Sequence, residues 1–177
     1  MRRHAFLIVF LLIFLFAGCS VDQTDGVPGA SDKEPGMTGY VMAKENERIL
    51  VVDPVSQDFS STGGVNEFYD AIWFSNIPEE IKEGDKVKVW FDAVAESYPG
   101  QSEAIKIEVV PASRPDGADL DESAAINKAL YSGEITTSWP TVLKSIEYNK
   151  ETDTWKISIR ETVEEPAKTF NLQIKDE

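Results

Sequence analysis

The single cysteine, Cys19, has the most clearly defined chemistry in this sequence. It follows the small residues Ala17 and Gly18, which come after an apolar run from Ala5 to Phe16 and a basic start. This three-part layout is typical of a signal peptide. The run is shorter than the about 20 apolar residues that span a bilayer. We therefore expect residues 1–18 to be removed by cleavage after Gly18.

The residues around the cysteine carry a second signal. The segment Leu15-Phe16-Ala17-Gly18-Cys19-Ser20 resembles a lipobox, the motif in which the cysteine sulfur receives a diacylglycerol before cleavage. The resemblance implies that Cys19 attaches the mature chain to a membrane through two acyl chains, which anchor stably where one chain binds only marginally. We therefore expect an extracytoplasmic lipoprotein.

Chemistry that needs histidine or a free thiol is excluded from such a mature chain. Cleavage removes His4, the only histidine, and lipidation occupies the only thiol. Ser-His-Asp and Cys-His catalytic sets and His/Cys zinc sites depend on those groups. We therefore expect a protein that is not an enzyme and that has no cofactor and no metal site.

The charge of the chain limits its partners. The sequence has 17 basic and 31 acidic residues, a formal charge of −14, and removal of Arg2 and Arg3 leaves 15 basic residues and a charge of −16. A field of this sign repels phosphate backbones and anionic lipid head groups. We expect no nucleic-acid partner, and membrane contact only through the lipid on Cys19.

Carboxylates are the remaining candidates for catalysis or metal binding. The neighbouring pairs Glu79-Glu80 and Glu164-Glu165 keep open a hydrolase of envelope glycans, in which two acids face each other across about 5 to 10 Å. A second group of acids precedes a predicted helix: Asp116, Asp119, Asp121 and Glu122. Their spacing differs from that of a calcium-binding loop, and it favours stabilisation of a helix N-terminus.

The segment from Glu96 to Gln101 is the most distinctive candidate binding loop. It joins the last two strands of a predicted barrel, where OB-type folds often hold ligands. Ser97, Tyr98 and Gln101 would then contact the ligand. The alternative is a tight turn in which Pro99 fixes one dihedral angle and Gly100 supplies a positive one.

Three aromatic residues on predicted strands form a second candidate. Trp73, Phe74 and Trp90 could stack on bases or sugars, as aromatic residues of OB-type domains do, although aromatic residues on strands also fill cores. Trp90 alternates with Val87, Val89 and Phe91 and so lies on the opposite face of its strand. We expect it to be covered by a second unit or exposed to a partner.

These residues are positioned by two predicted units that differ in their pattern of apolar and polar residues. Residues 19–36 are rich in Asp, Gly, Pro and Ser and are predicted to form a flexible tether. Residues 37–111 alternate between short apolar runs and turn residues, and predict strands over 39–43, 48–53, 71–75, 86–93 and 104–110. Five short strands favour a partly open OB-like barrel, because closure hides strand edges. Residues 49–52 are apolar on both faces, which predicts a central strand.

The second unit is predicted to follow a linker over 112–119. The capping-box spacing from Asp119 to Glu122 predicts a helix over 120–131 that ends before Gly133. Alternating residues predict three strands over 141–148, 154–161 and 169–175. The unit, residues 120–177, is expected to be a helix on the apolar face of an antiparallel meander. It is too small to be stable alone, so we expect it to dock on the barrel.

Four segments of the first unit carry a family resemblance: Gly39-Tyr40-Val41, Ala71-Ile72-Trp73-Phe74-Ser75, Gly84-Asp85-Lys86-Val87-Lys88-Val89-Trp90 and Glu96-Ser97-Tyr98-Pro99-Gly100-Gln101. Together they resemble the YobA-like lipoproteins of Gram-positive bacteria, over residues 39–110. The resemblance implies a small β fold outside the cell membrane and supplies no catalytic residues.

The function that the sequence favours is a non-catalytic binding or interaction module, tethered to the membrane and directed at an envelope protein or glycan. Two alternatives remain, a carboxylate-dependent hydrolase of envelope glycans and a purely structural envelope protein. A hydrolase requires a cleft in which acids converge. A binding module requires an exposed apolar patch or an open strand edge.

Overall fold

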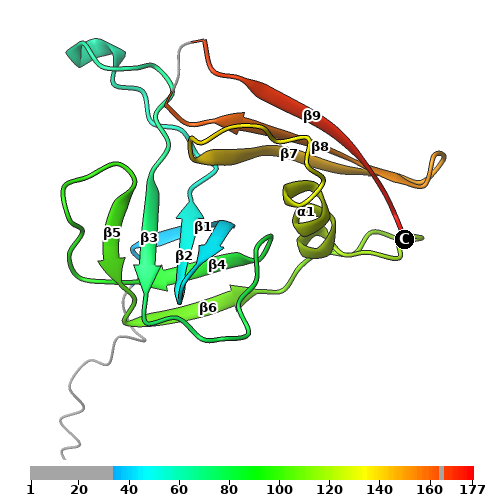
Figure 1. Ribbon diagram of the computed structural model, residues 1–177, viewed down its shortest axis with the longest axis horizontal. Helices are drawn as coiled ribbons and strands as arrows, with labels where there is room; N and C mark the ends of the chain where they lie inside the picture. Colours follow the sequence, from blue (N-terminus) through cyan, green and yellow to red (C-terminus); the bar gives the residue numbers. More distant parts are fainter. Residues whose placement is uncertain (1–33, 164–165) are drawn as a thin grey trace, which may run out of the picture.

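The structure is a computed structural model that describes residues 34–163 and 166–177. The fold within them is mainly β, as predicted, with a six-stranded mixed sheet, a three-stranded antiparallel sheet and one α-helix (Figure 1). The first sheet contains β1 (Met37–Glu45), β2 (Arg48–Val52), β3 (Ala71–Ser75), β4 (Lys86–Trp90), β5 (Gly100–Glu103) and β6 (Lys106–Val110). A 3₁₀ turn, η1 (Ser60–Thr62), lies between β2 and β3, and α1 (Glu122–Leu130), β7 (Thr141–Asn149), β8 (Thr154–Glu161) and β9 (Thr169–Lys175) follow. The predicted signal peptide with Gly18 and Cys19, most of the predicted tether, and Glu164-Glu165 lie outside the described residues.

The six-stranded sheet is a five-stranded barrel whose last strand is bent. The strand order is β5-β3-β2-β1-β4-β6, so the two edge strands follow each other in the chain. Only Ala104 and Ile105 separate them. The Ala104 amide donates to the Ser75 carbonyl at the end of β3 (3.1 Å), and the Ile105 amide donates to the Trp90 carbonyl at the end of β4 (2.8 Å). The bend therefore carries one strand between the two edges and closes the sheet, as in an OB-like barrel.

The predicted strands of the barrel differ from the observed ones most at its last two strands. The strand expected over 104–110 is observed as β6 over 106–110, and it is preceded by β5 over 100–103, which pairs in parallel with β3 and was not predicted. The Pro-Gly pair in the sequence indicated a turn and concealed this ladder. The strand expected over 86–93 ends at Trp90, whose carbonyl accepts the last hydrogen bond of the ladder with β6, from the Ile105 amide.

The central strand β2 has apolar side chains on both faces because both faces are buried. Ile49 and Val51 point into the barrel, where they pack with Val41, Phe74, Ile81, Val87 and Val89. Leu50 and Val52 point outward and belong to a second core. The predicted central position is confirmed, since β2 lies between β1 and β3.

The second unit is one helix on the apolar face of a three-stranded meander, as predicted. Ala125, Ile126 and Ala129 of α1 pack with Trp155 and Ile157 of β8. The helix expected over 120–131 begins two residues later, at Glu122. The N-cap is Asp121, whose Oδ1 accepts a hydrogen bond from the Ala124 amide (2.9 Å). No helix in the described part of the chain is long and apolar enough to cross a membrane.

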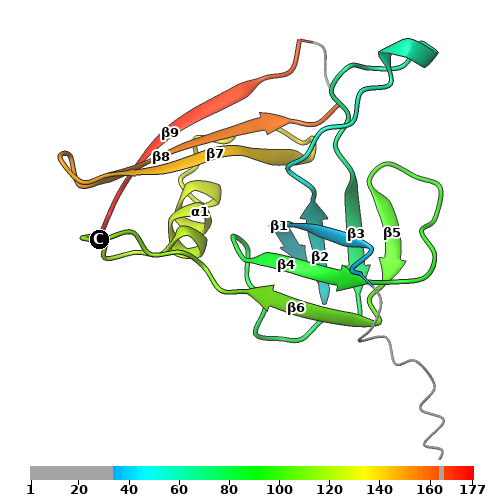
Figure 2. The same ribbon diagram turned by 180° about the vertical axis from the view of Figure 1, so that it is seen from behind.

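The second unit docks on the outer face of the barrel. Met42, Leu50, Val52, Tyr69 and Ala71 of the barrel side share one core with α1 and β7–β9. Figures 1 and 2 show α1 against the three-stranded sheet and beside the barrel in both views. OB folds often use the face of their second and third strands for ligands. In this protein that face is filled by its own C-terminal unit.

Candidate functional site

A cavity opens at the barrel end where β1 and β3 begin and β2 and β4 end. Its volume is about 330 Å³, within the usual range of small-ligand pockets, which are mostly apolar with a few convergent polar groups. The cavity, called the mouth cavity below, is framed by the connections 53–70 and 91–99. Its lining includes three aromatic residues and two carboxylates: Phe68, Phe91, Tyr98, Asp53 and Asp70.

The aromatic wall of the mouth cavity is held in place by contacts behind it. The rings of Phe68 and Tyr98 lie 5.6 Å apart between centroids, and the Tyr98 hydroxyl donates to the Tyr69 carbonyl (3.0 Å). Burial raises the pKa of Tyr98, and the charge of Asp70 raises it further. Tyr98 is therefore a neutral hydrogen-bond donor that is already engaged by the protein, and its ring is what it offers to a ligand.

The two carboxylates lie on adjacent strand ends. The Asp53 amide donates to the Asp70 carbonyl (3.0 Å), which extends the β2–β3 ladder by one step. Asp53 Oδ1 accepts from the Val55 amide (2.8 Å), and Asp70 Oδ2 accepts from Gln57 Nε2 (2.5 Å). Among the described residues, the second oxygen of each carboxylate has no hydrogen-bond partner and is available to a ligand. Because ionised carboxylates only accept hydrogen bonds, a ligand here must supply donors such as ammonium or hydroxyl groups.

The predicted binding loop is divided between the mouth cavity and the sheet. Ser97 and Tyr98 line the cavity, whereas Gln101 is exposed on β5 and its carbonyl accepts from the Ala95 amide (2.8 Å). The prediction that Gly100 has a positive dihedral angle is wrong. The turn instead contains a cis Tyr98-Pro99 bond, and Gly100 is buried against Val94, whose Cγ1 would lie 2.7 Å from an added Cβ.

The predicted aromatic platform is not assembled on one face. Phe74 is fully buried in the barrel. Trp73 is half-buried on the outer face, with the Arg48 guanidinium 5.1 Å from its ring centroid. Trp90 is only 8% exposed, and the Lys106 ammonium lies 4.5 Å from its ring centroid. Trp90 is therefore neither open to a partner nor part of the core shared with the second unit.

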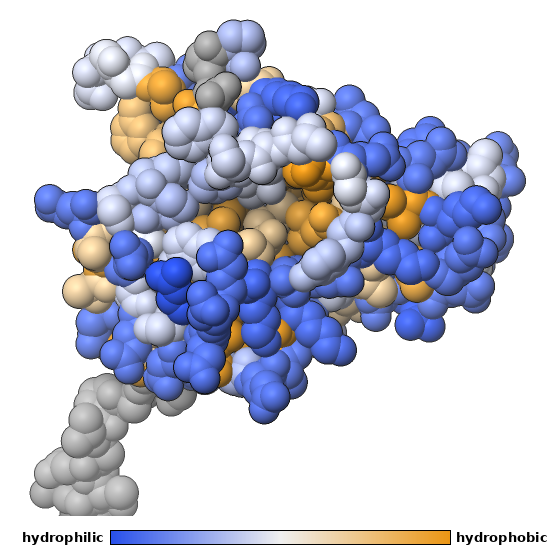
Figure 3. All heavy atoms as spheres, in the orientation of Figure 1, coloured by the Kyte–Doolittle hydropathy of each residue, from blue (hydrophilic) through white to orange (hydrophobic). Residues whose placement is uncertain are grey.

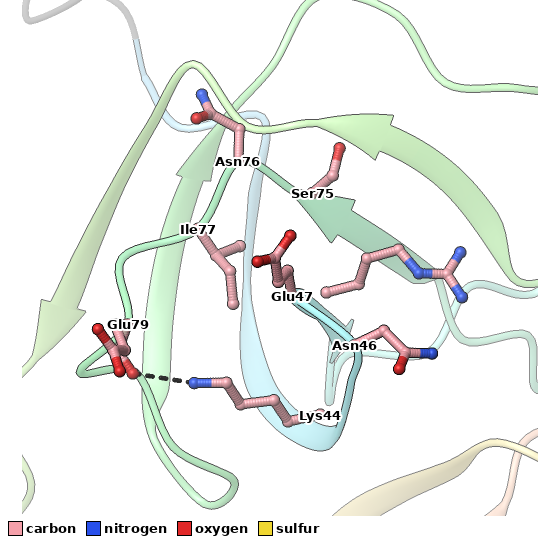
Figure 4. A pocket seen from close by; sticks show the side chains of 8 residues that line it. Lys44, Asn46, Glu47, Ser75, Asn76, Ile77 and Glu79 are labelled. Atoms are coloured by element: carbon pink, nitrogen blue, oxygen red, sulfur yellow. Dashed lines mark hydrogen bonds between the residues drawn. The ribbon is translucent and has the colours of Figure 1, made fainter.

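A larger hollow, about 660 Å³, lies at the other ends of β1, β2 and β3 (Figure 4). Lys44 reaches across it, and its ammonium donates to the carbonyls of Glu79 (2.9 Å) and Ile81 (2.8 Å). Its walls are mostly charged or amide side chains, and Ile77 is the one apolar residue of its lining. The lining of this hollow has no aromatic ring, so it offers a small ligand no stacking surface.

An ion-pair cluster fixes the connection that frames the mouth cavity. Glu67 on this connection accepts a hydrogen bond from Lys144 of β7 (2.8 Å) and forms an ion pair with Arg160 of β8 (2.6 Å). The buried Tyr69 hydroxyl also donates to Glu67. Hydrogen bonds from Lys144 and Tyr69 lower the pKa of Glu67. The second unit thus holds the cavity's frame through charge as well as through the apolar core.

The acids before α1 are used by the fold. Asp121 caps the helix, and Asp116 pairs with Lys150 (3.0 Å). Among residues 34–163 and 166–177, no group of three or more histidine, cysteine or acidic side chains is arranged to hold a metal ion.

One curated relative decides the family. The chain is 31% identical over 115 residues to the "Uncharacterized protein YobA" of Bacillus subtilis strain 168, an alignment that covers 59% of this chain and 93% of the relative. The chain belongs to the YobA-like family. The family model "Protein of unknown function (DUF3221)" matches residues 38–111, which are the barrel. A crystal structure of a YobA protein from the same bacterium is 25% identical and covers 44% of this chain and 96% of that chain, with a TM-score of 0.32.

The two carboxylates and two of the aromatic residues of the mouth cavity were not among the predicted site residues, namely Asp53, Asp70, Phe68 and Phe91. A signal for two of them was present. Asp53 closes one predicted strand and Asp70 precedes the next, so an antiparallel pairing of these strands would have placed the carboxylates side by side. Nothing in the sequence brings residues 68 and 91 to the same barrel end. Only the closure of the sheet does so.

Proposed function

We propose that this YobA-like protein is a non-catalytic binding module, held outside the cell membrane by a lipid on Cys19, and that the mouth cavity is its ligand site. The observation that carries the proposal is the combination of three aromatic rings and two partly open carboxylates around one cavity of small-ligand size. The ligand is a small organic molecule that has an apolar face and donates hydrogen bonds through hydroxyl or ammonium groups.

Asp70→Asn tests the ligand site, because the change removes the charge and keeps the shape. Ligand binding by the full chain is followed by NMR with a panel of amines and saccharides. Loss of a charged hydrogen bond should weaken an amine ligand by roughly tenfold or more. Asp58→Asn is the matched control, since Asp58 is an exposed acid just before η1 and does not line the cavity. Equal effects of the two changes would refute the site.

The anchor is tested separately in cells. The signal-peptide layout and the lipobox-like segment support lipidation at Cys19. Cys19→Ser removes the acylated sulfur, so the protein should leave the membrane fraction and appear in the soluble fraction. A Cys19→Ser protein that stays membrane-bound and is processed normally would contradict the anchor.

One observation favours a second candidate, the carboxylate-dependent hydrolase of envelope glycans. Asp53 and Asp70 line one cavity, and both are half-buried. A hydrolase would release reducing ends from isolated envelope glycans, and both Asp53→Asn and Asp70→Asn would abolish the release. Ligand binding without release of reducing ends would favour the non-catalytic binding module over the hydrolase.

A further inference from the structure

Two aromatic side chains stand out on the surface beside the second unit, away from the mouth cavity. Trp139 is 48% exposed and Tyr131 is 69% exposed. Both belong to the connection between α1 and β7. Trp139 is the exposed member of the four tryptophans, all of which fall in the described part of the chain. Large aromatic rings left in water mark interaction surfaces when they gather around a groove.

The exposure of Trp139 is imposed by the fold, because the connection is fixed around it. The Trp139 amide donates to Thr137 Oγ1 (3.0 Å), and the Thr162 amide donates to the Pro140 carbonyl (3.0 Å). Lys168 Nζ donates to the hydroxyl (3.0 Å) and the carbonyl (3.3 Å) of Thr136. These bonds fix the backbone from which the Trp139 ring projects, which lowers the entropy that a partner would lose on binding.

Tyr131 and Trp139 line a groove of about 260 Å³ between the barrel and the second unit. Met42, Leu130 and Ile135 also line it and give it an apolar surface. Figure 3 shows apolar side chains reaching the surface in the hollow between the barrel and the upper sheet. A groove of this kind suits a side chain with a long hydrocarbon stem.

The charged side chains that line the groove give it a negative electrostatic character. Glu45 and Glu83 line it together with Lys44. The Lys44 ammonium is directed to the carbonyls of Glu79 and Ile81, as described above. Glu83 Oε1 accepts from the Tyr131 hydroxyl (2.7 Å), which ties one carboxylate to one ring. The groove therefore complements a positive charge, in keeping with the net charge of the whole chain.

Other aromatic rings of this protein are paired with cationic side chains. The Lys86 ammonium lies 5.4 Å from the Tyr40 ring centroid, and Trp73 and Trp90 are paired with basic side chains as described above. Within the described residues, Tyr131 and Trp139 have no cation of this kind over them. Lysine and arginine combine an apolar stem with a cationic head, so they match both the surface and the rim of the groove.

We propose that the groove between Tyr131 and Trp139 is a docking site for a basic segment of another protein, whose lysine or arginine side chains lie between the two rings. The site is separate from the mouth cavity and takes a different partner. It gives the module two binding surfaces, one for a small ligand and one for a protein.

The test uses the full chain and an oligolysine peptide, with the same peptide acetylated on every lysine as the neutral control. Binding is measured by calorimetry and by tryptophan fluorescence. Because Trp139 is exposed, its emission maximum should shift when the peptide binds. Trp139→Ala should weaken binding by roughly two- to thirtyfold, the range of one cation–π contact. Glu83→Gln should weaken it as well. Trp139→Phe should keep most of the affinity and lose the emission shift.

Two variants serve as matched controls. Phe59→Ala removes another exposed aromatic ring, 41% exposed on the connection 53–70, and Asp70→Asn alters the mouth cavity. Neither should change peptide binding, so a failure of the mouth cavity as a ligand site would leave this result standing. The proposal is overturned if the oligolysine peptide does not bind, if the acetylated peptide binds equally, or if Trp139→Ala and Phe59→Ala have equal affinity.

Discussion

Asp176, the penultimate residue, holds together segments that are distant in the sequence. Its carboxylate is 2% exposed and accepts from the amides of Asp119 (2.5 Å) and Leu120 (2.9 Å) and from the Trp155 indole (2.8 Å). Figure 1 shows the C-terminus beside the segment that leads into α1. One side chain thus joins the chain end, the entry to the helix and the middle of the second core.

The protonation of Asp176 should make the stability of the protein depend on pH. Burial alone would raise the pKa of Asp176, but the three hydrogen bonds lower it below its ordinary value. The charged form therefore stabilises the fold above that ordinary value, and this contribution is lost as the pH falls through the lowered pKa, below about pH 4. Asp176→Asn should lower Tm by several degrees at neutral pH. The difference from wild type should close in acid.

Thermal melts of both proteins across this pH range check the prediction. Asp116→Asn is the control, because the Asp116 carboxylate is fully exposed and its pair with Lys150 lies at the surface. A constant difference between Asp176→Asn and wild type at every pH would contradict the role given to the charge.

At the scale of elements, α1 and the turn before β4 fit together through a glycine. Gly84 has φ of +95°, and a Cβ on it would lie 2.3 Å from the Ser123 carbonyl oxygen and 2.9 Å from the Asn127 nitrogen. Polar contacts surround this approach. Ser123 Oγ donates to Asp85 Oδ1 (2.6 Å), and Asn127 Nδ2 donates to the Glu83 carbonyl (3.0 Å). The helix backbone therefore rests directly on the turn.

Gly84→Ala should destabilise the protein by roughly 2 to 4 kcal/mol, because it adds a steric clash to an unfavourable backbone conformation. Gly63→Ala isolates the second effect. Gly63 has φ of +83° with nothing within 4 Å of its added Cβ, so this change should cost about 1 kcal/mol. Urea unfolding of the two variants measures the difference. If they lose equal stability, the contact between α1 and the turn is unimportant.

At the scale of the whole molecule, the two units share their stability. Leu50 and Val52 of the barrel lie in the same core as Trp155 and Leu172 of the three-stranded sheet. Separating the units would expose this surface on both sides, and apolar burial is the main source of stability for each. We therefore expect the two units to unfold together.

Calorimetry should show one transition for the full chain. Leu50→Ala should lower its stability by about 2 to 5 kcal/mol, the usual cost of this change in a core, and should leave a single peak. Ile105→Ala is the control, because Ile105 is 52% exposed, and it should have a small effect. Two separate peaks, of which only one moves in Leu50→Ala, would show that the units are independent.

Local patterns were sufficient to predict most elements and their faces. The last two strands were predicted with their observed bounds, since strict alternation over 154–161 and 169–175 fixes both the strand and its buried side. The loop 96–101 was predicted only in part, because whether Gly100 continues a turn or begins β5 depends on β3 lying beside it. Trp90 was placed on the outer face of its strand, but its burial under Lys106 depends on β6.

The sequence by itself determined the mainly β fold, the order of the elements and the exclusion of histidine and thiol chemistry from the predicted mature chain, because these follow from composition and short-range periodicity. It also carried the lipobox-like segment at Cys19. The tertiary structure alone decided where the candidate sites are. Closure of the barrel brings Asp53, Asp70 and Tyr98 around one cavity, and docking of the second unit places Trp139 beside β1. Both depend on contacts between residues far apart in the chain, which no local pattern specifies.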